Sequence, residues 1–273
     1  MPTMGGTNRG TMFGKLNSSL KRYTPGFQRF LKDSAHRVDL PLPKMLWGKT
    51  IWTHSRLWNH VKWDESVLQW ITEYLKPGDV FFDVGSHQGW LSMAAAGRVG
   101  RAGKVVAFEP SPELVKYLRF HKRMNRLVQM EIVSKAVTKD NAPATPFILV
   151  GNGDDVMNSL VEIEDVKTGP RGRATITVEA ITLDSYSEQS GLVPKMIKID
   201  TEGSEIWVCE GAKRLLAQSR PTLVIATHPE WLPDGQKIED LFSMLSTYGY
   251  RIVASETMQY NRVDFGDYLL VAE

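Results

Sequence analysis

The stretch Val80–Trp90 has the sequence VFFDVGSHQGW. An apolar segment with Asp83 near its end leads into a turn that contains Gly85 and Gly89. A strand, a glycine turn and a helix in this order often bind a nucleotide. A dinucleotide turn follows G-x-G-x-x-G, which lets the backbone approach a pyrophosphate. Counting from Gly85, the second and third glycine positions hold His87 and Trp90, although Gly89 follows. No Gly-Lys-Ser/Thr run comes after Gly89, so the turn predicts a ligand without a pyrophosphate.

A second acidic residue, Glu109, ends the next apolar segment, 20 residues after Gly89. A carboxylate at that place can accept hydrogen bonds from both hydroxyls of a ribose. Asp83 can accept from an ammonium group, directly or through water, and the helix N-terminus beyond Gly85 can face a carboxylate. A ribose, an amino acid and no phosphate together indicate S-adenosylmethionine. Two structural alternatives stay open: Asp83 as a cap of the turn, and Glu109 as an ordinary strand terminus.

Candidate proton acceptors follow two later apolar segments. Asp200 and Glu202 come after KMIKI, and His228 comes after PTLVIAT. A hydroxyl that accepts a methyl group benefits from losing its proton, so a general base is expected. Histidine, with an ordinary pKa of about 6.5, suits that role. Lys198 is a further candidate, but one pleat below Asp200 it is expected to pair with a carboxylate.

Asp200, Glu202 and His228 could also hold a divalent ion, since carboxylate oxygens and imidazole are metal ligands. Their spacing does not require one, and the prediction is that the site has no metal. For His228 the alternative is a loop histidine with a structural hydrogen bond. Asp200 and His228 are expected to end adjacent strands and to converge on the space above the donor methyl group.

Apolar segments expected to be strands alternate with segments expected to be helices, and together they position these residues. From Asp64, a plausible helix N-cap, strands and helices alternate, which predicts an α/β fold with a doubly wound, mostly parallel sheet. MEIVSKAV is expected to be the third strand, and RIVASE and DYLLVAE are expected to pair antiparallel at the end of the chain. Residues 138–194 break the alternation and predict a β-rich insertion. The methyltransferase-like domain is expected to span 61–273.

Residues 1–60 are expected to form a basic extension and a Trp-rich cap. Residues 1–37 carry seven basic side chains and one acidic side chain, a net charge of +6, which leaves −4 for the remainder because the total is +2. Packing of helices onto the body is the expected role, and nucleic acid, an acidic membrane face, a partner or organelle targeting are alternatives. Five of the eight tryptophans fall between Trp47 and Trp70 and are expected to bury a flank, or to form a lid.

Composition narrows the class of protein. The chain has 273 residues, 42% hydrophobic and 23% charged, as in ordinary globular proteins. No apolar run approaches the roughly 20 residues of a membrane span, and no secretory pattern opens the chain. Cys209 is the single cysteine, which excludes an intrachain disulfide and a cysteine-based zinc site. A cytoplasmic protein is expected.

Several motifs resemble, in order and spacing, the FkbM-type methyltransferases. They are FFDVGSHQGWLSM, VVAFEPSPE, ITLDSY, IKIDTEGSEIWVCEGA and PTLVIATHPEWL. The resemblance covers roughly Leu75 to the C-terminus, and IKIDTEGSE followed by EGA is its most specific part. It implies a seven-stranded class I methyltransferase (Rossmann-like) sheet, S-adenosylmethionine as the donor, and usually a hydroxyl acceptor on natural products or sugars.

The resemblance also implies roles for individual residues. Asp200 and Glu202 would stand beside the methyl group, and Glu109 would hold the ribose. The other implied cofactor contacts are Asp83, Gly85, Ser86, the His87 backbone and Gly89 in the first loop, Ser111 at the adenine edge, and Ala136 and Val137, ending the third strand, along the adenine. The chain departs from the family at His87, where asparagine is common, and at Ala226, where glutamate is frequent.

These observations predict an S-adenosylmethionine-dependent O-methyltransferase that acts on a small molecule or a sugar or glycan. An RNA methyltransferase that uses the basic arm is one alternative. A non-catalytic S-adenosylmethionine-binding protein is another, which the departure at Ala226 permits. An NAD oxidoreductase is disfavoured by His87 and Trp90.

Overall fold

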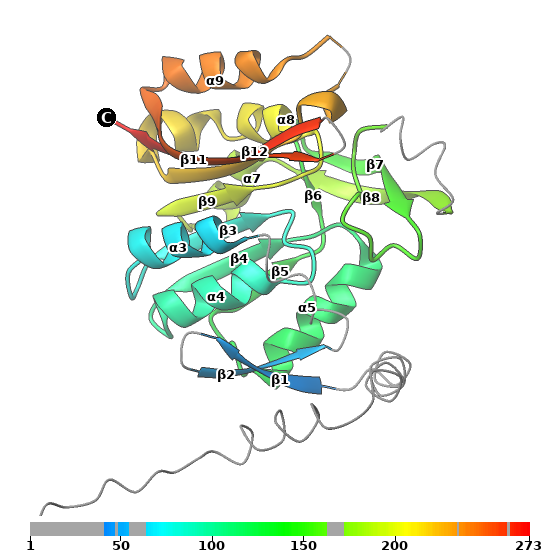
Figure 1. Cartoon of the computed structure of the whole chain (residues 1–273), viewed down its shortest axis with the longest axis vertical. Coiled ribbons are helices and arrows are strands. Elements are labelled where there is room, and N and C mark those ends of the chain that lie inside the picture. The colour runs from blue at the N-terminus through cyan, green and yellow to red at the C-terminus, as the bar shows by residue number, and fades with distance from the viewer. Residues whose placement is uncertain (1–40, 47–48, 55–63, 163–171, 234, 261–262) are drawn as a thin grey trace, which may run out of the picture. The chain divides into compact units, whose positions relative to one another are not determined.

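The computed structural model describes residues 41–46, 49–54, 64–162, 172–233, 235–260 and 263–273 (Figure 1). The chain divides into two compact units, Met1–Trp58 and Asn59–Glu273. The helical segments expected before residue 38 lie outside the described residues, as do Trp47, Trp58 and Trp63.

The described part of the first unit is an antiparallel hairpin of β1 (Pro41–Leu46) and β2 (Lys49–His54). The sequence pattern predicts no strand here, because Pro41 and Pro43 interrupt it. Alternate residues of a strand direct their N–H groups to the same edge, so both prolines fit the outer edge of a two-stranded sheet. Trp52 lies on β2.

The second unit contains the remaining elements. In chain order they are α3 (Glu65–Tyr74), β3 (Val80–Val84), α4 (Trp90–Val99), β4 (Lys104–Phe108), α5 (Pro112–Met124), β5 (Met130–Val133), β6 (Ala136–Val137), β7 (Ala142–Val150), β8 (Arg173–Ile181), α7 (Leu183–Ser190), β9 (Met196–Ile199), α8 (Glu205–Glu210), the π-helical turn η2 (Leu215–Ser219), β10 (Thr222–Thr227), the 3-10 turn η3 (Pro229–Trp231), α9 (Ile238–Thr247), β11 (Tyr250–Tyr260) and β12 (Val263–Ala272).

Seven of these strands form one sheet in the order β11-β12-β10-β9-β3-β4-β5. The five strands from β10 to β5 are parallel, and β12 runs antiparallel between β10 and β11. The predicted seven-stranded, mostly parallel sheet and its antiparallel C-terminal pair are confirmed. The chain adds β4 and β5 on one side of β3 and then returns to add β9 on the other side, so the strand order reverses at β3.

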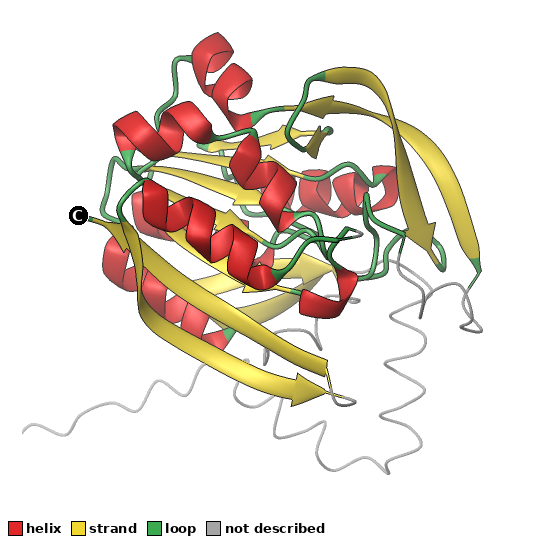
Figure 2. Cartoon of the chain, turned by 90° about the horizontal axis from the view of Figure 1, so that it is seen from above, coloured by secondary structure: helices red, strands yellow, loops and turns green. Residues whose placement is uncertain are grey.

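Helices cover both faces of this sheet (Figure 2). α7, α8 and α9 pack on one face, in a buried cluster that includes Phe82 and Phe108. α3, α4 and α5 lie on the opposite face. Tyr186 of α7 contacts the Phe82 and Phe108 rings edge-to-face, with centroids 5.5 and 4.9 Å apart. Each such pair contributes about 0.5–1.5 kcal/mol beyond the area that it buries, which fixes α7 on the sheet.

A second sheet has three strands in the order β6-β8-β7. MEIVSKAV, predicted as one strand, is therefore two. Met130–Val133 belongs to the large sheet, whereas Ala136 and Val137 pair with β8 in the small one. A tight turn separates them, since Lys135 N donates to Val133 O at 2.9 Å. The prediction that Ala136 and Val137 end the third strand is wrong for this reason. The range expected to be β-rich also contains the helix α7.

Candidate active site

The carboxyl ends of β3, β4, β9 and β10 meet at one edge of the large sheet. Open α/β sheets bind ligands outside these ends, at the point where the strand order reverses. Asp83, Glu109, Asp200 and His228 all lie at or just after these ends. The topology therefore brings the main predicted site residues to one place.

The first loop is shaped by close contacts between backbones. Gly85 has φ +71°, and a Cβ atom there would lie 1.8 Å from the carbonyl oxygen of Asp200. Only glycine allows the β3 loop and the end of β9 to approach so closely. The Gly85 and Ser86 N–H groups both donate to Phe108 O, at 3.2 and 3.0 Å. Gly89 has φ +83° and packs on Leu118, so the predicted glycine pattern has a steric reason.

Glu109 is buried at the end of β4 and connects two loops. Its carboxylate oxygens accept from His87 N and from Ser111 N, both at 2.9 Å. Burial raises the pKa of Glu109 to about 7, although these two N–H groups and Lys198 oppose the rise. Each carboxylate oxygen has a second lone pair. Glu109 can therefore accept the two ribose hydroxyls that the sequence assigned to it.

Buried polar atoms around this loop are suited to hold a ligand. Among the described residues, Ser86 Oγ, Gln88 Oε1 and Thr201 Oγ1 are buried without a hydrogen-bond partner. Buried polar groups are rarely left unpaired, and each exception calls for an explanation such as a ligand. Ser86 and Gln88 flank the turn, and Thr201 follows Asp200 at the end of β9. The residues present thus fit a polar cofactor at this edge.

Asp83 is fully buried at the end of β3. It accepts from the Ser92 hydroxyl of α4, and its other oxygen lies 3.5 Å from Lys198 Nζ. Lys198 Nζ also donates to Gly85 O at 2.9 Å and lies 3.2 Å from Asp200 Oδ2. The contact with an ammonium group, directly or through water, stays a prediction for Asp83. Asp83 and Lys198 also hold the first loop against β9.

Lys198 remains charged in this environment. Burial alone would lower its pKa, but Asp200, Asp83 and Asp64 raise it well above its usual range. A permanently protonated lysine cannot accept a proton from a substrate. The structure thus shows the predicted pairing of Lys198 with carboxylates, those of Asp83 and Asp200.

Two further acids line the same edge and were missed as site residues. Burial raises the pKa of Asp64 to about 6, with repulsion from Asp200 and Asp83 adding to the rise. Asp64 precedes α3, but its side chain makes no capping hydrogen bond. Burial, with repulsion from Asp200 and Asp64, raises the pKa of Asp267 to about 7. Such a set of crowded carboxylates favours a cationic ligand.

Asp267 lies on β12, directly opposite Ala226 of β10. In the antiparallel pairing of β10 and β12 it is the partner of Ala226, where the family often carries glutamate. Directly opposite residues project to the same face of a sheet. Asp267 therefore places a carboxylate next to the position where Ala226 lacks one. Long-range strand pairing supplies this acid, and no local motif could have indicated it.

Asp200, Glu202 and His228 form a compact cluster just beyond β9 and β10. One ligand atom from each lies within 4.8 Å of the other two. His228 Nε2 is 3.3 Å from Glu202 Oε2 and 3.8 Å from Asp200 Oδ1. The predicted convergence of Asp200 and His228 is present. The three side chains could hold a divalent cation as well as a proton.

The His228 ring is fixed on its other side. Its Nδ1 lies 2.9 Å from Oε1 of Glu205, which also accepts from Thr201 N and Gly203 N. Trp231 stacks on the ring, with centroids 5.1 Å apart and planes 6° from parallel. Glu205 and Trp231 were not predicted as site residues, although both lie within the quoted family motifs.

These contacts change the acid–base properties of the cluster. Burial would lower the pKa of His228, but Glu202 and Glu205 raise it to about 10. The ordinary value of about 6.5 assumed from sequence does not apply. Burial, with Asp200 and Glu205, raises the pKa of Glu202 to about 8 against the pull of His228. Burial opposes the shift of Asp200, yet Lys198 and His228 keep its pKa below the usual range.

A loop of the insertion also borders the site, which the sequence did not predict. His87 Nε2 lies 3.3 Å from Asp154 O, and Ser111 Oγ donates to Gly153 O at 2.6 Å. Ser159 Oγ donates to Glu202 O at 2.7 Å. Ser111 is fully buried as the N-cap of α5, so its hydroxyl is committed to the protein.

The strand order and the site at its reversal define a class I S-adenosylmethionine-dependent methyltransferase fold. Residues 83–252 match the methyltransferase FkbM domain. The chain belongs to this family, and its cofactor is S-adenosylmethionine. Within the described part of the chain, no helix is long and apolar enough to cross a bilayer.

Individual relatives are distant. A probable cobalt-precorrin-6B C(15)-methyltransferase (decarboxylating) from Saccharolobus solfataricus is 20% identical over 167 residues, which is 60% of this chain and 81% of that protein. The structure of an FkbM methyltransferase from Methylobacillus flagellatus KT has 15% identity and a TM-score of 0.46. That match covers 74% of this chain but only half of the other. An S-adenosylmethionine-dependent methyltransferase from Aquifex aeolicus has 17% identity and a TM-score of 0.43, covering 88% and 98%.

Proposed function

We propose that this protein transfers a methyl group from S-adenosylmethionine to a hydroxyl of a small molecule, such as a natural product, or of a sugar or glycan. The observation that carries the proposal is the cluster of Asp200, Glu202 and His228 at the strand ends. A hydroxyl oxygen is a weak nucleophile until its proton is lost, and this cluster contains proton acceptors.

The chain's own residues suit the donor. Glu109 would accept the ribose hydroxyls, and the unpaired Ser86 hydroxyl lies in the loop that would carry the amino-acid end. Asp64 and Asp200 would face the cationic groups, which would relieve their mutual repulsion. When bound, the donor supplies an activated methyl group on a sulfonium sulfur. Positioning the acceptor oxygen in line with that methyl group supplies much of the rate acceleration.

Glu202 is the proposed proton acceptor. A base works best when its pKa lies near the working pH, and the pKa of Glu202 is about 8. The acceptor hydroxyl donates its proton to the Glu202 carboxylate as the oxygen attacks. His228, held as an imidazolium by the carboxylates around it, is then a positioning residue that orients Glu202.

Aromatic side chains beside the cluster support an acceptor with a ring. Trp231 and Phe265 contact each other and His228, with ring centroids 5.1–5.7 Å apart. Aromatic faces of this kind bind flat rings and the C–H faces of sugars. The precorrin relative is named for methylation at carbon, so the choice of oxygen rests on the residues of this chain.

The proposal is tested by incubating the protein with methyl-labelled donor and a panel of phenols, sugars and polyhydroxylated compounds. Label in a methyl ether, formed by the wild type and lost in Glu202→Gln, would support it. Label on carbon or nitrogen in every product formed would contradict it.

A further inference from the structure

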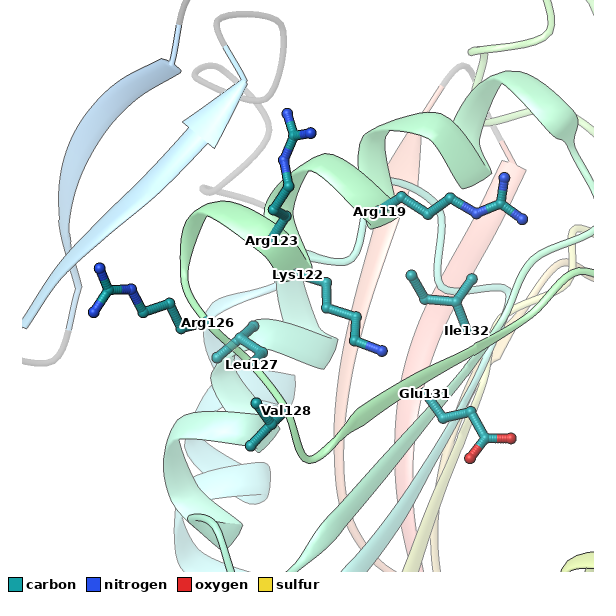
Figure 3. A pocket seen from close by; sticks show the side chains of 8 residues that line it. All are labelled: Arg119, Lys122, Arg123, Arg126, Leu127, Val128, Glu131 and Ile132. Atoms are coloured by element: carbon teal, nitrogen blue, oxygen red, sulfur yellow. The ribbon is translucent and has the colours of Figure 1, made fainter.

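A groove between the C-terminal half of α5 and the edge strand β5 gathers four cationic side chains. They are Arg119, Lys122, Arg123 and Arg126 (Figure 3). The groove has a volume of about 450 Å³, within the range of ligand-binding clefts. Arg119, Lys122 and Arg123 lie on α5, whereas Arg126 follows the end of the helix with φ +52°. All four side chains line the same groove.

This charge is not neutralised within the described chain. Among the described residues, none of the four side chains has an ion pair or a hydrogen bond. Glu131 is the one acidic residue among the eight that line the groove. Its carboxylate is engaged by Lys104 at 2.9 Å and by the Tyr186 hydroxyl at 2.8 Å, and the charge of Lys122 also acts on it and favours its ionised form. An excess of positive charge remains for an external partner.

The arrangement of the side chains indicates what kind of anion they fit. Figure 3 shows Arg119 and Arg126 pointing to opposite sides, Arg123 pointing away from the strand, and Lys122 pointing toward it. The four groups spread out and do not converge on one point. A single phosphate would be held by converging donors, whereas a spread set fits an extended anionic surface.

The apolar part of the groove distinguishes between extended anionic partners. Leu127, Val128 and Ile132 also line it, and Val128 is 63% exposed. None of the eight lining residues is aromatic, so the groove lacks the stacking platform on which single-stranded nucleic acid depends. Cations next to exposed aliphatic side chains are typical of surfaces that contact the headgroup region of an anionic bilayer.

We propose that this groove docks the protein peripherally on a membrane leaflet that contains anionic phospholipids. Arg119, Lys122, Arg123 and Arg126 contact the lipid phosphates and carboxylates, and Val128 enters the boundary below them. The net charge of +6 that the sequence gives residues 1–37 has the same sign. This inference concerns where the protein acts and does not depend on the acceptor.

The test uses the full chain and sedimentation with vesicles. Phosphatidylcholine vesicles are compared with vesicles in which part of the lipid is phosphatidylserine. The wild type should bind the anionic vesicles alone, and binding should weaken as salt increases. Replacing all four groove cations with glutamine should weaken partitioning by about fivefold per cation. Val128→Ser should also weaken it, without changing the salt dependence.

A matched variant separates the groove from net charge. Lys76, Arg101, Lys195 and Lys213 are exposed cations elsewhere on the unit, and replacing these four with glutamine removes the same charge. That variant should retain most of the wild-type binding. An unchanged affinity for S-adenosylmethionine in both variants checks that they fold. If the fourfold groove variant does not fold, the double variant Arg123→Gln/Arg126→Gln takes its place. Failure of the wild type to bind anionic vesicles, equal losses in both variants, or binding to single-stranded RNA with none to vesicles would overturn the proposal.

Discussion

His228 Nδ1 lies 2.9 Å from Glu205 Oε1, and both side chains are buried beneath the acidic edge of the sheet. Glu205 begins α8, whereas His228 follows β10, so two elements far apart in sequence fix one imidazole ring. The contact turns the opposite nitrogen toward Glu202 and Asp200. Glu205 thereby orients the histidine and, together with Glu202, raises its pKa.

Glu205→Gln should remove this control with little change in shape. Glutamine keeps an oxygen that can accept from Nδ1 but loses the negative charge. The pKa of His228 should fall by about one to three pH units, because a nearby opposite charge is lost. NMR titration of the imidazole nitrogens measures it. Glu188→Gln, on the exposed face of α7, serves as the control. An unchanged titration in Glu205→Gln would contradict the assignment.

Stability should decline as the pH rises from neutral. The folded-state pKa of His228, about 10, is above its unfolded value of about 6.5, so the folded protein binds more protons in that interval. The contribution is complete below about 6.5 and is lost as the pH rises through about 10. Glu202, raised from 4.5 to about 8, acts in the same direction. Urea unfolding from neutral to alkaline pH measures the decline. Removing the imidazole in His228→Gln should flatten it, and a stability that rises with pH would refute the shift.

Glu109→Ala should weaken binding of the donor. The substitution removes the acceptor of two hydrogen bonds from the ribose, each contributing about 1.5–3 kcal/mol when the carboxylate is ionised. We expect the dissociation constant to rise at least tenfold in calorimetric titration with S-adenosylhomocysteine. Glu113→Gln, on the surface of α5, should bind like the wild type. If Glu109→Ala also binds like the wild type, the ribose contacts a different residue.

Chelators should leave methyl transfer intact. In the proposed mechanism the imidazolium of His228 occupies the space between Glu202 and Glu205, where its charge balances the carboxylates. Activity should therefore be the same after treatment with EDTA and after addition of Mg²⁺ or Mn²⁺. A loss with EDTA that one of these ions restores would show that Asp200, Glu202 and His228 hold a metal instead.

The sequence predicted the parts of the site that depend on local order. Gly85 and Glu109 each follow an apolar strand directly, and strand ends are readable from hydrophobic patterning. Asp200 and His228 were found in the same way, and the sheet places them together as expected.

The parts that were missed depend on contacts between distant segments. Asp267 gains its place only through the register of β12 against Ala226 of β10. Asp64 resembles an ordinary helix cap until the fold brings its charge near Lys198. The raised pKa of His228 likewise depends on its contact with Glu205, which lies 23 residues away in the sequence. Ala136 and Val137 were misplaced because a short turn inside an apolar run has no strong sequence signal.

The product of methyl transfer tests the central claim most directly. The wild type is supplied with ¹³C-methyl-labelled S-adenosylmethionine and hydroxylated acceptors, and the labelled product is identified by NMR across a range of pH. The account predicts a methyl ether, formed at a rate that rises with pH through about 8 as Glu202 ionises. In Glu202→Gln, turnover should fall by about 10²–10⁴ with donor affinity within a few fold. Label on carbon or nitrogen, or full activity of Glu202→Gln with the same pH profile, would contradict it.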